Sequence, residues 1–176
     1  SISVFDTLYA YWQKLSDTFE AGNVLMNRCN ALLLSGDARA ALASAGKYYD
    51  QNAGDPSLTR ICVTIRGNMG RYAIDLQEYD TAEKYLIETI AQAKKSGLES
   101  TLFNAYHTLT DLYRQTDRIM KFSELRGEQM ELLWNREEYS HLTEITKDTA
   151  KNLLKTKYSA QATTLETYSK DKLANI

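Results

Sequence analysis

Side chains with the chemistry of catalysis or metal binding are sparse in this sequence and do not cluster. The two histidines, His107 and His141, lie far apart, and neither has a second metal ligand at helical spacing. Glu137 and Glu138 are adjacent, but neighbours on a helix point in different directions, which does not suit a catalytic acid–base pair. There is no glycine-rich phosphate loop, nucleophile elbow or HExxH motif. The sequence therefore predicts a protein that is not an enzyme and has neither a cofactor nor a metal site.

A second set of polar side chains is better suited to recognition. Asn, Arg, Asp and His side chains can hydrogen-bond a peptide or a small polar ligand. We predict a groove that binds a protein or peptide partner and is formed by seven such residues: Asn30, Asn68, Arg71, Asn104, His107, Asp111 and Arg114. The alternative stays open that Arg71 with Asp75, and His107 with Asp111, only stabilise their own helices, because each is an i,i+4 pair. Both interpretations depend on the elements that carry these residues.

The composition predicts long helices in a globular, all-α protein. One Pro and eight Gly in 176 residues are too few for the many turns of a sandwich or barrel. The formal net charge of −2 gives no basic excess of the kind that nucleic-acid binding usually needs. No apolar run approaches the ~18 residues of a membrane helix. We therefore expect no nucleic-acid partner and no direct membrane insertion by this segment, and we leave a homodimer open.

An internal repeat organises the chain. The stretch around Ala82 recurs around Ala41, Phe122 and Ala162, at intervals of 41, 40 and 40 residues. Periods of roughly 20–50 residues indicate stacked supersecondary units. The helix before each of these stretches has a matching register of small residues: Cys29, Gly70, Thr110 and Ala150. Three residues later comes a residue that is larger in most units: Leu32, Ala73, Tyr113 and Leu153. We expect Ala82 to be the close-contact point of a helical hairpin, opposite Gly70.

This repeat resembles the tetratricopeptide repeat (TPR). The matching residues are Gly70, Tyr79 and Ala82 in the clearest unit, Gly36, Asp37 and Ala41 in the unit before, and Tyr113, Asp117 and Arg118 in the third, where Phe122 departs from the pattern. The resemblance implies an α-solenoid of about three to four TPR-like helical hairpins, with a period of 40–41 residues against a consensus of about 34. It also implies that the first helix of each hairpin lines the concave side.

The repeat divides a single domain, residues 1–176, into segments. We predict a partial unit or cap over 1–20, repeats over 22–60, 61–100 and 101–140, and a degenerate repeat or connecting helix over 141–176. The expected helices are 3–19, 22–35, 38–52, 56–77, 79–96, 99–116, 119–134, 137–156 and 159–174. Asp55 is the expected N-cap before Pro56, and Gly97 the left-handed stop of its helix. The first helix is expected to place Phe5, Leu8, Tyr9, Trp12 and Leu15 on one face.

The two cysteines, Cys29 and Cys62, are predicted to be free, buried thiols, because two cysteines make neither a disulfide framework nor a metal site. Such thiols are compatible with any compartment. The chain begins with SISVF, without Met, and ends with KLANI, so we expect that flanking segments are missing.

The function that these patterns favour is a non-enzymatic interaction or sensor module. The polar helical run from 137 to 176 is similar to the layout of the extracytoplasmic repeat domains of bacterial sensor histidine kinases. An extracytoplasmic, periplasmic location is therefore favoured over a cytoplasmic one. The alternative is a self-contained cytoplasmic TPR adaptor or peptide-responsive regulator.

Overall fold

The structure is a computed structural model that describes residues 2–153 and residue 167. Within these residues all regular structure is helical, which confirms the predicted all-α class. The helices are α1 (Ile2–Lys14), α2 (Thr18–Leu34), α3 (Ala38–Asn52), the 3₁₀ helix η1 (Pro56–Leu58), α4 (Thr59–Asp75), α5 (Tyr79–Ser96), α6 (Glu99–Gln115), α7 (Ile119–Asn135) and α8 (Tyr139–Leu153). The chain forms two compact units, residues 1–112 and 113–176. The predicted helix 159–174 and the repeat position Ala162 lie outside the described residues.

The same turn recurs after α2, α4 and α6. Each turn contains one residue with positive φ, namely Gly36 at 87°, Gln77 at 59° and Asp117 at 54°. In each, the next residue donates its N–H to a carbonyl five residues back, over 2.9 Å: Asp37 to Leu32, Glu78 to Ala73 and Arg118 to Tyr113. This is the longer bond of a Schellman motif, which satisfies the last carbonyls of a helix. The three acceptors are residues of the predicted repeat register.

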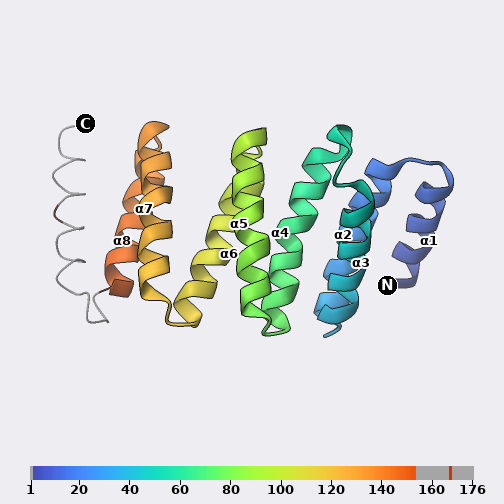
Figure 1. The fold of residues 1–176 in the computed structure, drawn as a ribbon, viewed down its shortest axis with the longest axis horizontal. Helices are drawn as coiled ribbons and strands as arrows, with labels where there is room; N and C mark the ends of the chain where they lie inside the picture. The colour runs from blue at the N-terminus through green and yellow to red at the C-terminus, as the bar shows by residue number, and fades with distance from the viewer. Residues whose placement is uncertain (1, 154–166, 168–176) are drawn as a thin grey trace. The chain divides into compact units, whose positions relative to one another are not determined.

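The first unit places its helices next to one another in chain order (Figure 1). Its core contains both registers of the repeat, because Cys29, Ala73, Ala41 and Ala82 are all buried to within 1% of complete burial. Burial of such small residues allows helices to approach closely. The buried side chains of Ile65 and Tyr72 fill the space beside them.

The predicted contact between Ala82 and Gly70 is wrong by about one helical turn. A Cβ atom built on Gly70 would lie 2.7 Å from Cγ of Leu86, so the residue that needs Gly70 to be small is Leu86. A Cβ atom on Gly67 would likewise lie 3.2 Å from Cγ2 of Thr89. The small residues of the hairpin were recognised correctly, but their pairing across it was not.

Two predicted helix boundaries are also wrong. The predicted helix 3–19 ends at Lys14, and Ser16 has a φ of 57°. Asp17 then caps α2, because its side chain accepts the N–H of Glu20 over 3.0 Å. The predicted helix 56–77 begins as the 3₁₀ helix η1, where Asp55 accepts the N–H of Ser57 as the expected cap. Gly97 is left-handed, as predicted, with a φ of 64°.

Helix α1 has two apolar stripes rather than one. Phe5, Tyr9 and Trp12 are partly buried, while Leu8 and Leu15 of the predicted face are exposed. Val4 and Tyr11 extend the exposed stripe.

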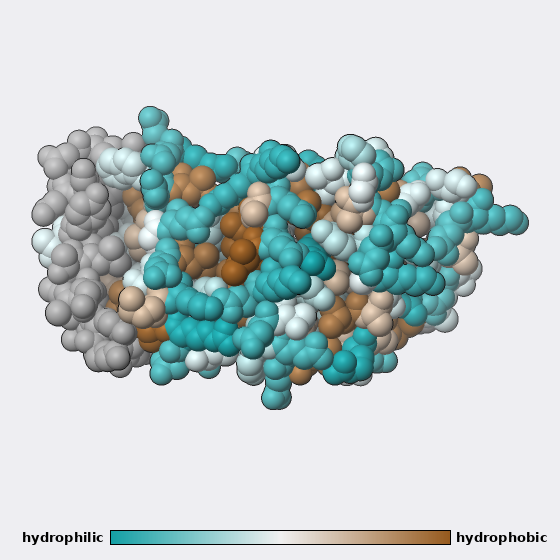
Figure 2. All heavy atoms as spheres, viewed as in Figure 1, coloured by the Kyte–Doolittle hydropathy of each residue, from teal (hydrophilic) through white to brown (hydrophobic). Residues whose placement is uncertain are grey.

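The other large exposed aliphatic residues are scattered, and the face seen in Figure 2 is mainly hydrophilic with separate hydrophobic patches.

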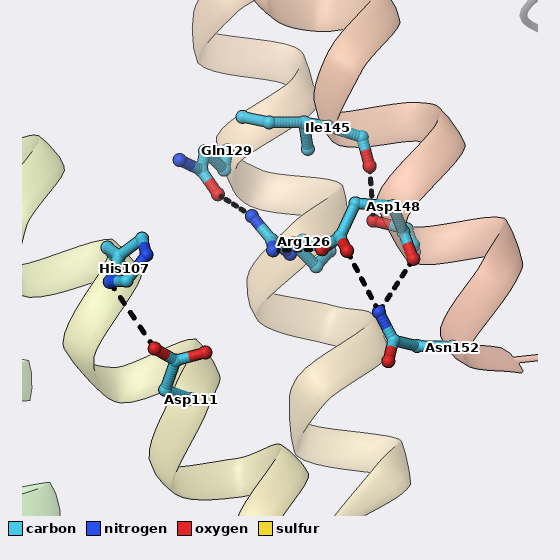
Figure 3. A network of polar contacts seen from close by, with 8 residues as sticks. His107, Asp111, Arg126, Gln129, Ile145, Asp148 and Asn152 are labelled. Carbon is cyan, nitrogen blue, oxygen red and sulfur yellow. Dashed lines mark hydrogen bonds and ion pairs between the residues drawn. The ribbon is translucent and has the colours of Figure 1, made fainter.

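The second unit contains α7 and α8, which a polar network joins (Figure 3). Arg126 on α7 donates to Asp148 on α8 over 2.7 Å and to Gln129 over 3.0 Å. Asp148 also accepts the side-chain amide of Asn152 over 3.1 Å. The Arg126 side chain is only 11% exposed, so these bonds offset part of the cost of removing its charge from water.

Candidate functional site

A hollow between α4 and α6 gathers the polar residues of two first helices. Its volume is about 280 Å³, and it lies within the first unit. Its lining residues are Thr64, Gly67, Asn68, Arg71, Thr101, Asn104, Ala105, His107 and Thr108. Four of the seven predicted groove residues are therefore brought together: Asn68, Arg71, Asn104 and His107.

Helical spacing explains why these side chains share one hollow. Thr64, Asn68 and Arg71 are four and three residues apart on α4, so they lie on one face of that helix. Thr101, Asn104 and Thr108 lie on one face of α6 for the same reason. The two faces meet where the hydroxyl oxygens of Thr64 and Thr101 lie 3.2 Å apart. Stacking of two first helices therefore forms the hollow.

The threonines of the hollow are occupied by local hydrogen bonds. Thr64 donates to the carbonyl of Arg60 over 2.9 Å, and Thr108 donates to that of Asn104 over 2.8 Å. The side chains of Asn68, Asn104 and Arg71, in contrast, make no hydrogen bond or ion pair with the described residues. The hollow thus exposes two amides and one guanidinium that are available to a ligand.

Of the two i,i+4 pairs that the sequence offered as an alternative to binding, His107 with Asp111 and Arg71 with Asp75, the structure contains only the first among the described residues. Nδ1 of His107 lies 3.4 Å from a carboxylate oxygen of Asp111, so this pair is formed (Figure 3). Arg71 makes no such pair with Asp75 within the described part of the chain. Stabilisation of its own helix is therefore an explanation for His107, but not for Arg71.

The remaining predicted residues have other surroundings. Asn30 on α2 does not line the hollow, and its side-chain oxygen accepts a long hydrogen bond of 3.5 Å from the hydroxyl of Tyr72. Arg114 is exposed and belongs to the second unit. The seven predicted residues do not include the other five that line the hollow, which are Thr64, Gly67, Thr101, Ala105 and Thr108. Counting three and four residues from Asn104 would have found Thr101 and Thr108.

Burial alters the acidity of the two cysteine thiols. Cys29 and Cys62 are free and buried, as predicted. Desolvation raises the pKa of the Cys29 thiol from 9.0 to about 11, although the Arg28 charge partly opposes the shift. Burial also raises the pKa of Cys62, followed by a smaller effect of the Asp55 charge. Both thiols are therefore protonated at neutral pH, which makes them poor nucleophiles.

Within residues 2–153 and 167, no three His, Cys, Asp or Glu side chains are grouped so that they could hold a metal ion. No helix in that part of the chain is long and apolar enough to cross a membrane.

Comparison with known proteins identifies the fold. No protein-family model and no curated protein matches the chain. Among solved structures, the chain is similar to the nearly identical TPR-like repeats of a Podosopora anserina protein described as a kinesin light chain. That match has a TM-score of 0.73 and 14% sequence identity, and covers 99% of this chain and 86% of the other. A single-substitution variant of the same protein matches with the same TM-score and identity, over 85% of its length. The chain therefore has the fold of a TPR-like α-solenoid, as its repeat predicted.

Proposed function

We propose that this chain is a non-enzymatic module that binds a protein or peptide partner in the hollow between α4 and α6. The observation that carries the proposal is the set of unengaged polar groups there, the amides of Asn68 and Asn104 and the guanidinium of Arg71. Surface amides and guanidinium groups are common, but here they converge on one concavity. Convergent polar groups in a hollow are typical of binding sites.

The fold supports the same proposal. A solenoid of TPR-like hairpins presents its first helices along an extended concave surface, and such surfaces bind other proteins. The hollow lies between two first helices and holds about 280 Å³, which suits a short peptide segment better than a large cofactor.

We further propose that this module is the extracytoplasmic sensor domain of a bacterial signalling protein. The alternative is a self-contained cytoplasmic adaptor. The support is the polar helical layout that begins at residue 137, of which α8 is the described part. The full-length coding sequence tests it. A signal peptide before residue 1 and an apolar stretch of ~20 residues after residue 176 are expected, and their absence would favour the adaptor.

Affinity capture with a matched control tests the binding surface. The wild-type protein and an Asn68→Ala/Arg71→Ala variant are immobilised, and proteins captured from the native cell extract are compared. Lys84→Ala is the control, because Lys84 is an exposed cation on α5 outside the hollow.

We expect the double variant to lose the captured partner and to keep its melting midpoint, since Arg71 is exposed, Asn68 is only half-buried, and neither side chain bonds within the described residues. Lys84→Ala should behave as the wild type does. Equal capture by the double variant would contradict the proposed surface. Unfolding of the double variant would show that these residues are structural.

A further inference from the structure

The charge in the hollow is uncompensated. None of its nine lining residues is an Asp or Glu, while Arg71 contributes a permanent positive charge. Arg71 is exposed and forms no ion pair within the described part of the chain. The carboxylate of Asp111, which does not line the hollow, lies 3.4 Å from Nδ1 of the lining residue His107. The hollow therefore favours a negatively charged group over a neutral or positive one.

From this we infer that the partner presents an acidic side chain, Asp or Glu, to Arg71 from an extended peptide segment that crosses the hollow. The inference rests on the proposed function and specifies its ligand. A guanidinium has a planar set of donors that can bind both oxygens of a carboxylate at once. Because Arg71 has no partner among residues 2–153, it can meet a carboxylate without first breaking an ion pair there.

The amides that line the hollow together with Arg71 suit the peptide backbone that would carry such a side chain. An Asn side chain has both a donor and an acceptor, which match the C=O and N–H of one peptide group. Asn68 lies on α4 and Asn104 on α6, so the two amides come from opposite walls of the hollow. Neither amide bonds within the described protein. The combination selects an acidic peptide rather than a free inorganic anion, which has no N–H groups to offer.

Binding of defined peptide pools tests this inference. Fluorescent nonapeptide pools with a fixed central Glu, Gln, Lys or phosphoserine and random flanking residues are titrated with wild-type protein. Glu and Gln differ in charge but hardly in shape, so their comparison isolates the carboxylate. The same titrations are made with Arg71→Ala, Arg71→Lys, Asn68→Ala/Asn104→Ala and the control Lys84→Ala.

We expect the Glu pool to bind about tenfold or more tightly than the Gln pool, which is the size of one charge-assisted contact. Arg71→Ala should abolish this preference. Arg71→Lys should retain part of it, because it keeps the charge without the planar donor set. Lys84→Ala should leave it unchanged. Binding of the Glu pool should weaken as salt is raised, because an exposed ion pair is screened.

Three outcomes would overturn the inference. If the Glu and Gln pools bind equally, and binding is lost in Asn68→Ala/Asn104→Ala, the hollow binds peptides without selecting acidic ones. If the phosphoserine pool binds more tightly than the Glu pool and inorganic phosphate competes with it, the ligand is a phosphate. If no pool binds, or no hollow variant changes binding, the proposed function fails as well.

Discussion

Two arginines on the same helix, Arg66 and Arg71, have opposite surroundings. The Arg66 side chain is 13% exposed, and its guanidinium bonds the carboxylate of Glu88, with Nε at 2.8 Å. It also lies over the rings of Tyr49 and Tyr85, at 4.6 and 4.1 Å from their centroids. Arg71, one and a half turns later, is exposed and bonds nothing in the described protein.

The difference shows that α4 has one face that packs and another that is open. The packing face carries Arg66 and Gly70, and each of these meets a residue of α5 closely. The open face carries Asn68 and Arg71, which line the hollow. Arg66 on the first face has its partners within the fold, whereas the side chains of Asn68 and Arg71 on the second face have none among the described residues. The predictions below separate the two faces, beginning with the largest effect.

Gly70→Leu is expected to destabilise the protein by about 3 kcal/mol through overpacking. The new side chain would start from a Cβ 2.7 Å from Cγ of Leu86, and the packed helices leave little room to move. Urea denaturation at pH 7 measures the effect. Combining it with Leu86→Ala should cost less than the sum of the two single variants, because they change one contact. Strict additivity would show that the close approach lies elsewhere.

Arg66→Ala is expected to cost about 2 kcal/mol, because it removes a charge-assisted bond and two cation–π contacts from a largely buried site. It also leaves Glu88 without its partner. Denaturation by urea, with Lys84→Ala as a surface reference, gives the difference. A loss below about 0.5 kcal/mol would mean that this network does not hold the hairpin together.

Alkaline pH is expected to destabilise the packed core through Cys29, which occupies the Gly70 position of the preceding repeat. Its folded pKa, about 11, lies above its ordinary value of 9.0. The stability that the neutral thiol contributes is therefore complete below pH 9 and is lost as the pH rises through 11. The expected loss from this group at pH 10 is about 1 kcal/mol.

Urea denaturation at pH 7 and pH 10 checks this effect against Cys29→Ala as the control. The buried hydroxyl of Tyr72, whose pKa burial also raises, changes stability in the same direction in both proteins. The variant should therefore lose less stability between the two pH values than the wild type does. Equal losses would contradict a buried, protonated Cys29.

Arg71→Ala is expected to change the free energy of unfolding by less than about 0.5 kcal/mol, the smallest effect of the series. The same substitution in the same helix should thus give very different results at positions 66 and 71. A cost for Arg71→Ala comparable with that of Arg66→Ala would remove the distinction between the two faces.

The sequence was sufficient to predict the features that repeat locally. The turns after α2, α4 and α6 are formed by hydrogen bonds between residues that are near each other in the chain. Their positions could therefore be predicted from the repeat interval of 40–41 residues. Asp17 and Glu20 are a local capping signal for α2 that the predicted boundary at residue 22 overlooked.

Contacts across helices were harder to predict. Periodicity identified Gly70 as small, but not Leu86 as its neighbour, because a shift of one turn preserves the pattern of small residues. It placed Arg71 and Asn104 on first helices without showing that Arg66 points the other way. That distinction depends on Tyr49, Tyr85 and Glu88, which only the folded chain brings together.

The most direct test of the two-faced helix is NMR of the side-chain N–H signals during titration with the Glu-centred nonapeptide pool. The Nε–H signals of Arg66 and Arg71, and the amide signals of Asn68 and Asn104, report both faces in one sample. We predict that the signals of Arg71, Asn68 and Asn104 shift with the peptide, while the signal of Arg66 stays in place. Shifts at Arg66 without shifts at Arg71, or no shift at any of the four, would contradict the account.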